Sequence, residues 1–122
     1  MNNQAFIDAF KEFQKQMWEN SESKGFHEND KDVETLAQSQ ARISQRLMLV
    51  VSELAEAMEA LRHMNPPDSH IPEYSGMEAE LADAIIRIMD LAEQQGLRLA
   101  DAIVAKASYN AGRPYMHGGK KF

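Results

Sequence analysis

The chain has 122 residues, a formal net charge of -6 and no cysteine. Its acidity argues against a general binder of nucleic acid polymers or anionic membranes, because both partners are themselves negatively charged. The lack of cysteine excludes disulfides, thiolate metal sites and a cysteine nucleophile. The length predicts a single domain over residues 1–122, large enough to bury a core.

The composition predicts an all-α fold. Ala, Glu, Gln, Leu and Met dominate and β-branched residues are few, which favours helices. No apolar run approaches the length needed to span a bilayer, and residues 1–4 lack the basic and apolar parts of a signal peptide. We therefore expect a cytoplasmic protein with no membrane partner.

The first predicted helix covers residues 3–20. Four apolar side chains recur there at helical spacing and form an amphipathic stripe that is typical of core packing. They are Phe6, Phe10, Phe13 and Met17. Trp18 lies beside the stripe near the end of the helix, where it either joins the core or lines a ligand pocket.

Residues 21–32 are polar, contain Gly25 and show no periodicity, so we expect a loop. The segment Lys24-Gly25-Phe26-His27 is either a flexible lip over a site or an ordinary surface turn. A lone histidine in such a loop is usually solvated, and we expect this of His27.

Three further helices are predicted, and proline or glycine follows each of them. They begin between residues 32 and 36, at 76 and at 99, and they end at about residues 63, 95 and 111. The start of the second helix is expected to fray near residues 38–40. A basic, glycine-rich tail over residues 113–122 follows the last helix. The pattern predicts a four-helix bundle.

Two of these helices carry paired carboxylates in otherwise apolar sequence. Glu53 and Glu56 follow the apolar run of residues 47–51, and Glu80 and Asp83 stand in the next helix. Residues three apart lie on one face of a helix, so each pair points in one direction. Most such pairs face water, but carboxylates buried between helices would repel one another and lose hydration, which a cation relieves. Two interpretations stay open, a solvated face and a divalent metal site.

If a metal binds, four oxygen ligands without His or Cys suit Mg²⁺, with Mn²⁺ as the alternative. Mg²⁺ commonly shares its ligand shell with the phosphates of a substrate. Lys106, Asn110 and Arg113 offer a point charge, an amide donor and a planar fork for phosphate oxygens. The residues therefore predict a site for a small phosphorylated ligand and not for a polymer.

Glu53-x-x-Glu56, then 23 intervening residues, then Glu80-x-x-Asp83, form a paired carboxylate motif. In type and spacing it resembles the motif of the MazG-like, all-alpha nucleoside triphosphate pyrophosphohydrolases. The chain departs from many family members at Ser52, where they have a further Glu. This departure leaves the number of metal ions, one or two, open.

Other segments share the resemblance, which covers the chain from about residue 18 to the end. Lys106-x-x-Tyr109-Asn110-x-x-Arg113 is similar to the Lys and Asn positions of the family's later helix. Lys24-Gly25-Phe26 and the Gly-Gly-Lys of the tail are similar to features of MazG-like members. These matches are individually less specific than the carboxylate motif.

The resemblance implies an enzyme that cleaves a nucleoside triphosphate between the α and β phosphates, giving the monophosphate and pyrophosphate. It implies Mg²⁺ on the four carboxylates, with Glu53 or Glu56 accepting a proton from the attacking water. Lys106 and Arg113 would steady the departing pyrophosphate, and Trp18 would stack on the base. The implied role is removal of surplus or non-standard deoxynucleotides, with no base preference fixed.

The resemblance also implies a homodimer or homotetramer. Apolar residues on more than one side of the second and third helices agree with this, because short bundles tend to bury such faces against a copy. Two alternatives stay open. One is a pyrophosphohydrolase of a phosphorylated metabolite such as phosphoribosyl-ATP, and the other is a non-catalytic helical interaction module.

Overall fold

The computed structural model describes residues 3–114 and is all-helical over this range. Its elements are α1 (Gln4–Ser23), the short 3₁₀ helix η1 (Glu28–Asp32), α2 (Leu36–Arg62), α3 (Gly76–Gln94) and α4 (Leu99–Ala111). The described residues contain no β-strand, only an isolated bridge between Pro67 and Ser75. The predicted all-α class and its four helices are confirmed, and the arrangement is consistent with a helical bundle.

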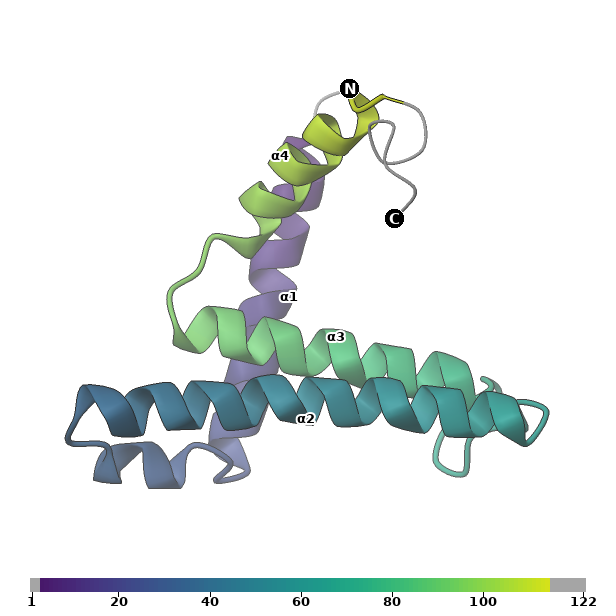
Figure 1. Cartoon of the computed structure of the whole chain (residues 1–122), viewed down its shortest axis with the longest axis horizontal. Helices are drawn as coiled ribbons and strands as arrows, with labels where there is room; N and C mark the ends of the chain where they lie inside the picture. Colours follow the sequence, from purple (N-terminus) through teal and green to yellow (C-terminus); the bar gives the residue numbers. More distant parts are fainter. Residues whose placement is uncertain (1–2, 115–122) are drawn as a thin grey trace.

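The four helices form two arms that meet at a crossing. Figure 1 shows α2 and α3 side by side and running in opposite directions, with α1 crossing behind them. α1 packs against α3, and α4 packs along the N-terminal half of α1. Because both paired carboxylate motifs lie on the α2–α3 arm, the fold brings them next to each other.

Both helices of this arm begin with a capping box. The Thr35 side chain accepts from the backbone N–H of Gln38, and the Gln38 side chain accepts from that of Thr35. Ser75 and Glu78 do the same for α3. Each capping box satisfies two backbone N–H donors at the start of its helix. Gln38 is part of the capping box of α2. The fraying expected near residues 38–40 was therefore a wrong prediction, and α2 is continuous.

A tight connection joins α2 to α3. Asn65 adopts a left-handed conformation (φ 51), and its Oδ1 accepts a hydrogen bond of 2.8 Å from the Met77 backbone N–H. The Gly76 N–H donates to Pro66 O at 2.7 Å. A Cβ on Gly76 would lie 3.1 Å from the Ala60 Cβ, which is tighter than usual, so the two helices lie close together here.

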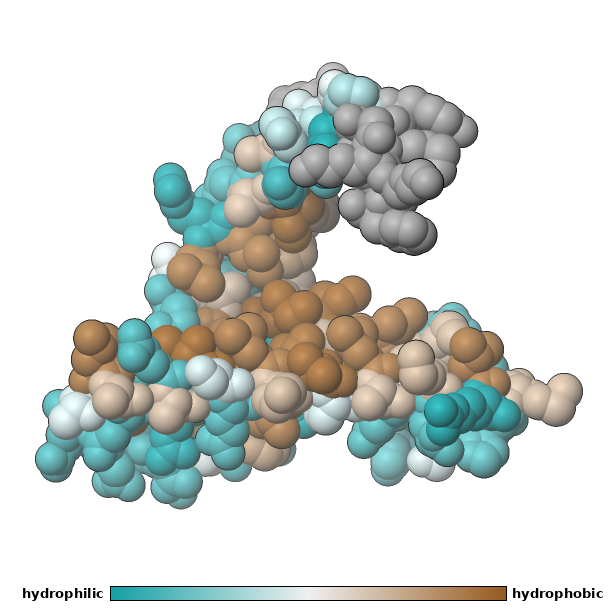
Figure 2. Space-filling model, in the orientation of Figure 1, coloured by the Kyte–Doolittle hydropathy of each residue, from teal (hydrophilic) through white to brown (hydrophobic). Residues whose placement is uncertain are grey.

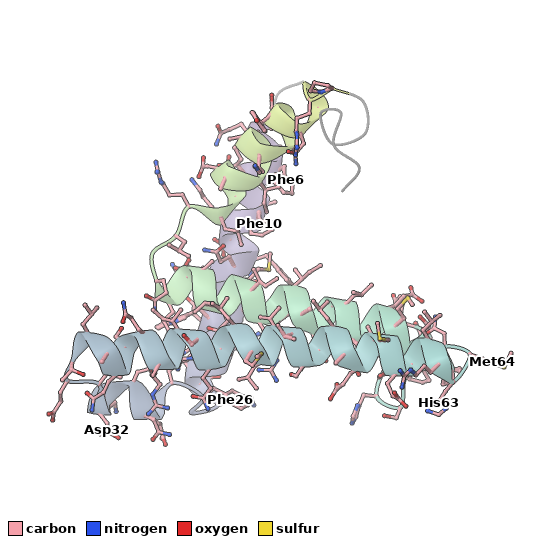
Figure 3. All side chains as sticks on the ribbon, viewed as in Figure 1. Phe6, Phe10, Phe26, Asp32, His63 and Met64 are labelled. Carbon is pink, nitrogen blue, oxygen red and sulfur yellow. The ribbon has the colours of Figure 1, made fainter. Side chains whose placement is uncertain are left out.

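The core of the described chain is small. Its buried apolar residues are mostly alanines, namely Ala57, Ala79, Ala84, Ala92 and Ala100, with Val50, Met89 and Leu91. None of its large side chains is fully buried. Figure 2 shows hydrophobic residues spread along the α2–α3 arm and up the angle toward α4, and Met64 extends alone from the end of α2 (Figure 3). Among residues 3–114, no helix has both the length and the apolar character needed to cross a membrane.

Candidate metal centre and adjoining cavity

Three carboxylates from two helices converge on the α2–α3 arm. One oxygen each from Glu53, Glu80 and Asp83 can be chosen so that all three lie within 4.8 Å of one another. Glu53 is buried, Glu80 is half-buried and Asp83 is exposed, so the cluster reaches from the interior to solvent. Glu56 is exposed on the same face of α2 and interacts with Glu53 and Glu80.

The pKa values of these groups are shifted apart. A hydrogen bond with Glu53, burial and the nearby Glu56 together raise the pKa of Glu80 to about 8. Burial and the charge of Glu53 raise the pKa of Asp83. Burial alone would raise the pKa of Glu53, but hydrogen bonds from Glu80 and Arg87 outweigh it and lower that pKa. The metal-free cluster therefore retains a proton on Glu80 at neutral pH.

Arg87 provides a positive charge inside the cluster. Its Nε donates to Glu53 Oε1 at 2.9 Å. Its sequence position, one turn after Asp83, suggests a pair within α3, but the guanidinium reaches across to α2 instead. One guanidinium does not balance the carboxylates around it. Glu80 Oε2 is buried without a hydrogen-bond partner, which is the environment that a cation would complete.

The donor set fits a hard divalent cation. Carboxylate oxygens with no nearby sulfur ligand are what Mg²⁺ and Mn²⁺ prefer. Ser52 is not aimed at the cluster, because its hydroxyl donates to the Leu49 carbonyl of its own helix at 2.6 Å. The residue at the family's further Glu position is thus engaged with the backbone, which favours a site built from the remaining carboxylates.

A cavity of about 290 Å³ adjoins the carboxylates. Its walls are contributed by the end of α1, the following turn, α2 and α3. The lining residues are Ser21, Phe26, His27, Arg46, Leu49, Glu53, Asp83, Ile86, Arg87, Asp90 and Leu91. Phe26, which is 74% exposed, lies below α2 at the edge of this cavity (Figure 3). The cavity combines apolar walls with polar ends, as ligand sites usually do.

His27 closes one side of this cavity and is buried, in contrast to the expectation of a solvated loop histidine. Its Nδ1 lies 2.9 Å from Glu22 Oε2, and its Nε2 lies 3.0 and 3.2 Å from the two oxygens of Asp90. Trp18 stacks on its ring at 5.7 Å between centroids. The segment expected to be loop instead extends α1 to Ser23 and includes η1. Nothing in the local sequence marks His27, because Asp90 is distant along the chain.

The remaining predicted site residues lie elsewhere in this chain. Trp18 does not line the cavity beside the carboxylates; it lines a second cavity on the other side of His27. Lys106, Asn110 and Arg113 are exposed at the end of α4, where the Lys106 Nζ sits 4.9 Å from the Tyr109 ring centroid. α4 packs mainly against α1. Tail residues 115–122 lie outside the described range.

Comparison of the chain with protein-family models, with curated proteins and with solved structures finds no match. The features of the chain that bear on its function are therefore the converging carboxylates, the adjoining cavity and the carboxylate motif.

Proposed function

We propose that the chain is a cytoplasmic, Mg²⁺-dependent nucleoside triphosphate pyrophosphohydrolase of the MazG-like type. The observation that carries the proposal is the meeting of Glu53, Glu80 and Asp83 within 4.8 Å, beside a cavity with apolar walls. The buried, unpartnered Glu80 Oε2 supports a cation at this point. The cavity supplies space for the nucleoside portion of a substrate next to the position of its phosphates.

The proposed reaction is attack of water on the α-phosphorus. A new P–O bond forms, the anhydride bond to the β-phosphate breaks, and the products are the monophosphate and pyrophosphate. Mg²⁺ or Mn²⁺ bound by Glu53, Glu80 and Asp83 would supply positive charge against the phosphate oxygens. The chain's own residues then have two tasks, which are to hold the carboxylate ring and to accept the water's proton.

Glu56 is the carboxylate best placed to accept that proton. It faces the cluster, but it is exposed and stands outside the three close oxygens, so it retains a free lone pair toward solvent. Glu53, the other candidate, accepts the Arg87 hydrogen bond instead. Arg87 fixes Glu53 in position and adds a positive charge near the phosphates.

The proposal includes assembly of the chain as a homodimer or homotetramer. The apolar residues exposed on the carboxylate arm would be covered by a copy. Lys106 and Asn110 lie on α4 and Arg113 just after it, and α4 packs mainly against α1, so their proposed role in holding phosphates would involve a partner subunit.

The test is pyrophosphate release from a panel of ribo- and deoxynucleoside triphosphates, with Mg²⁺ and with chelator. We expect Mg²⁺-dependent release with the monophosphate as the second product. Glu53→Gln and Asp83→Asn should each lower kcat/KM on the order of a hundredfold or more, because each removes a metal ligand. In chelator, Asp83→Asn should leave the thermal midpoint unchanged or raise it, since repulsion in the cluster is relieved. Glu53→Gln should lower the midpoint, because Arg87 would lose its ionised partner.

Glu59→Gln is the matched control, because Glu59 is exposed on α2 and bonds only His63 and Arg62. Its activity should equal that of the parent protein. If no triphosphate is cleaved by the folded protein, a phosphorylated metabolite becomes the first substrate to examine. If Mg²⁺ and nucleotide also leave the thermal midpoint unchanged, the chain is a non-catalytic interaction module.

A further inference from the structure

His27 is the residue through which the connection between α1 and α2 is anchored to the rest of the molecule. From residue 15 to residue 49 it is the only buried residue, with 7% of its surface exposed. Phe26, the large apolar residue of the same turn, is 74% exposed and lies below α2 (Figure 3). The turn of residues 24–27 therefore gains little from apolar burial, and its buried side-chain contacts are those of His27.

Each ring nitrogen of His27 faces a carboxylate. Nδ1 lies 2.9 Å from Glu22 Oε2 at the end of α1, and Nε2 lies 3.0 and 3.2 Å from the two oxygens of Asp90 on α3. A hydrogen bond needs one proton between its two heavy atoms, and a neutral imidazole has a single N–H. The two contacts together therefore require two protons, as in an imidazolium held between two carboxylates.

The charged groups around His27 do not compensate for the loss of a proton from its ring. Besides Glu22 and Asp90, four carboxylates and three cationic side chains line the two cavities that His27 adjoins, so negative charge exceeds positive charge. Two of the cations are already paired with carboxylates of this set, Arg46 with Asp30 and Arg87 with Glu53. The seven groups are Asp30, Lys31, Arg46, Glu53, Asp83, Arg87 and Glu93.

His27 also separates the two cavities. Of the described residues, His27 alone lines both the cavity of about 290 Å³ beside the carboxylates and the neighbouring cavity of about 430 Å³. Asp90 belongs to the first cavity, whereas Glu22 and Trp18 belong to the second. If the ring moved away from these partners, the two cavities would become continuous and the entrance to the carboxylates would widen.

We propose that His27, Glu22 and Asp90 form a proton-dependent latch on the cavity beside the carboxylates. With two protons the latch is closed, and the turn of residues 24–27 is held against α1 and α3. Loss of one proton leaves a lone pair of the ring facing a carboxylate oxygen, and the two repel each other. The ring then leaves its site, the turn is released together with Phe26, and the cavity opens as pH rises. The latch concerns access to the cavity and does not depend on the reaction proposed above.

Trp18 reports the state of the latch, because it is the only tryptophan of the chain and stacks on the His27 ring at 5.7 Å between centroids. The measurement is its fluorescence in chelator from about pH 5 to about pH 8, the range in which histidine changes charge. We expect the emission to shift to the red and its quenching by acrylamide to increase as pH rises, because the indole loses the stacked ring and meets water. An emission that stays constant over this range would overturn the latch.

Asp90→Asn is expected to abolish this transition. The new amide can donate to a neutral Nε2 while Nδ1–H donates to Glu22, so both contacts survive the loss of a proton. The emission should then keep its acid value up to about pH 8. Glu22→Gln tests the other ring nitrogen by the same logic. Because it changes an exposed side chain, it decides the question if Asp90→Asn does not fold.

Two further variants are controls. Glu80 has a pKa raised to about 8, so it titrates in the same range, but it lines neither of the two cavities. Asp101 pairs with Lys11 between α4 and α1. Glu80→Gln and Asp101→Asn should both keep the parental transition. A transition that persists in Asp90→Asn and Glu22→Gln, or one that disappears in Glu80→Gln, would assign the titration to another group and overturn the role of His27.

Discussion

Glu80 is the side chain on which the electrostatics of the centre depends. It stands between Glu53 and Glu56, its Oε2 is buried without a partner, and its pKa is raised to about 8. A carboxyl that keeps its proton can donate to Glu53, which removes one charge from a crowded site. Binding of the proposed Mg²⁺ would displace that proton, so the positive charge of the metal ion would replace that of the proton.

This shift makes the stability of the metal-free protein depend on pH. The unfolded chain titrates Glu80 near its usual 4.5, and the folded chain holds the proton up to about 8. Between these values the folded state binds more protons, so the free energy of unfolding falls as pH rises. In chelator, the thermal midpoint of the parent protein should fall from about pH 5 to about pH 8, and that of Glu80→Gln should fall less.

The neighbouring carboxylates define the controls. The raised pKa of Asp83 also makes the free energy of unfolding fall as pH rises. The lowered pKa of Glu53 changes the stability only below pH 4.5, which is outside this range. Glu19→Gln changes an exposed position on α1, so its thermal midpoint should depend on pH as that of the parent protein does. Mg²⁺ should raise the midpoint most at the alkaline end, where the carboxylates are ionised. A parental midpoint in chelator that stays constant or rises would mean that folded Glu80 is ionised.

Sequence reasoning found the four carboxylates because their spacing on a helix is a local property. It treated His27 as a solvated loop residue and Asp90 as a further ligand or a charge partner, but it did not predict that the two meet. It also did not predict the Arg87–Glu53 pair, because such contacts depend on how the helices pack. It left Arg87 free to pair within its own helix, where no tertiary neighbour competes. The charges of a site are thus readable from the chain, but their partners are not.

At the scale of elements, the spacing between α2 and α3 sets the distances between the carboxylates. Gly76 faces Ala60 across the two helices, close enough that a Cβ on Gly76 would lie 3.1 Å from the Ala60 Cβ. Gly76 lies one turn before Glu80, and Ala60 lies one turn after Glu56. The contact therefore acts next to the site on both helices, and small residues there allow the carboxylates to converge.

Gly76→Ala tests whether the close contact between Gly76 and Ala60 controls the spacing of the carboxylates. The added Cβ would meet the Ala60 Cβ at 3.1 Å and Pro66 O at 3.4 Å, both attached to rigid backbone. We expect a loss of about 1–3 kcal/mol in the free energy of unfolding from overpacking. The helices should also part slightly, so that Mg²⁺ raises the thermal midpoint less than in the parent protein.

The exchanged pair, Gly76→Ala with Ala60→Gly, should restore the Mg²⁺ response while remaining less stable, because glycine inside a helix costs about 1 kcal/mol. If Gly76→Ala alone keeps the full Mg²⁺ response, helix spacing at this contact does not control the site.

Helix existence was predictable for physical reasons that differ from one element to the next. α4 and the start of α3 were predicted at their observed bounds, because proline, glycine and a capping serine mark them. The start of α2 was expected to fray near residues 38–40, yet the Thr35 capping box holds it. η1 was missed because its five residues are held by contacts such as Arg46 with Asp30.

At the scale of the whole molecule, the apolar surface exceeds what the chain covers by itself. A stripe on α2 is formed by Val51, Leu54, Met58 and Leu61, and a stripe on α3 by Leu81, Ile85 and Ile88. Every one of these side chains is exposed. Large contiguous apolar patches on a protein surface usually mark an interface.

We expect the parent protein to sediment as a dimer or tetramer across the micromolar range. Ile85→Glu should shift it toward monomer and lower its thermal midpoint, because a charge would then be buried in the contact. Met64→Lys is the control, since Met64 is 92% exposed at the end of α2 and outside both stripes. A parent protein that sediments as a monomer at every concentration would remove the partner subunit from the proposal.

The placement of all four carboxylates on one helical hairpin has a consequence for the order of folding. Only the α2–α3 connection, residues 63–75, must close to bring them together, and the entropy cost of loop closure rises slowly with loop length. Contacts between helices adjacent in sequence form early, because little chain lies between them. The residues proposed to hold the ion would thus come together among the early contacts between helices. A cation present during synthesis would act as a template for the hairpin, ahead of the docking of α1 and α4.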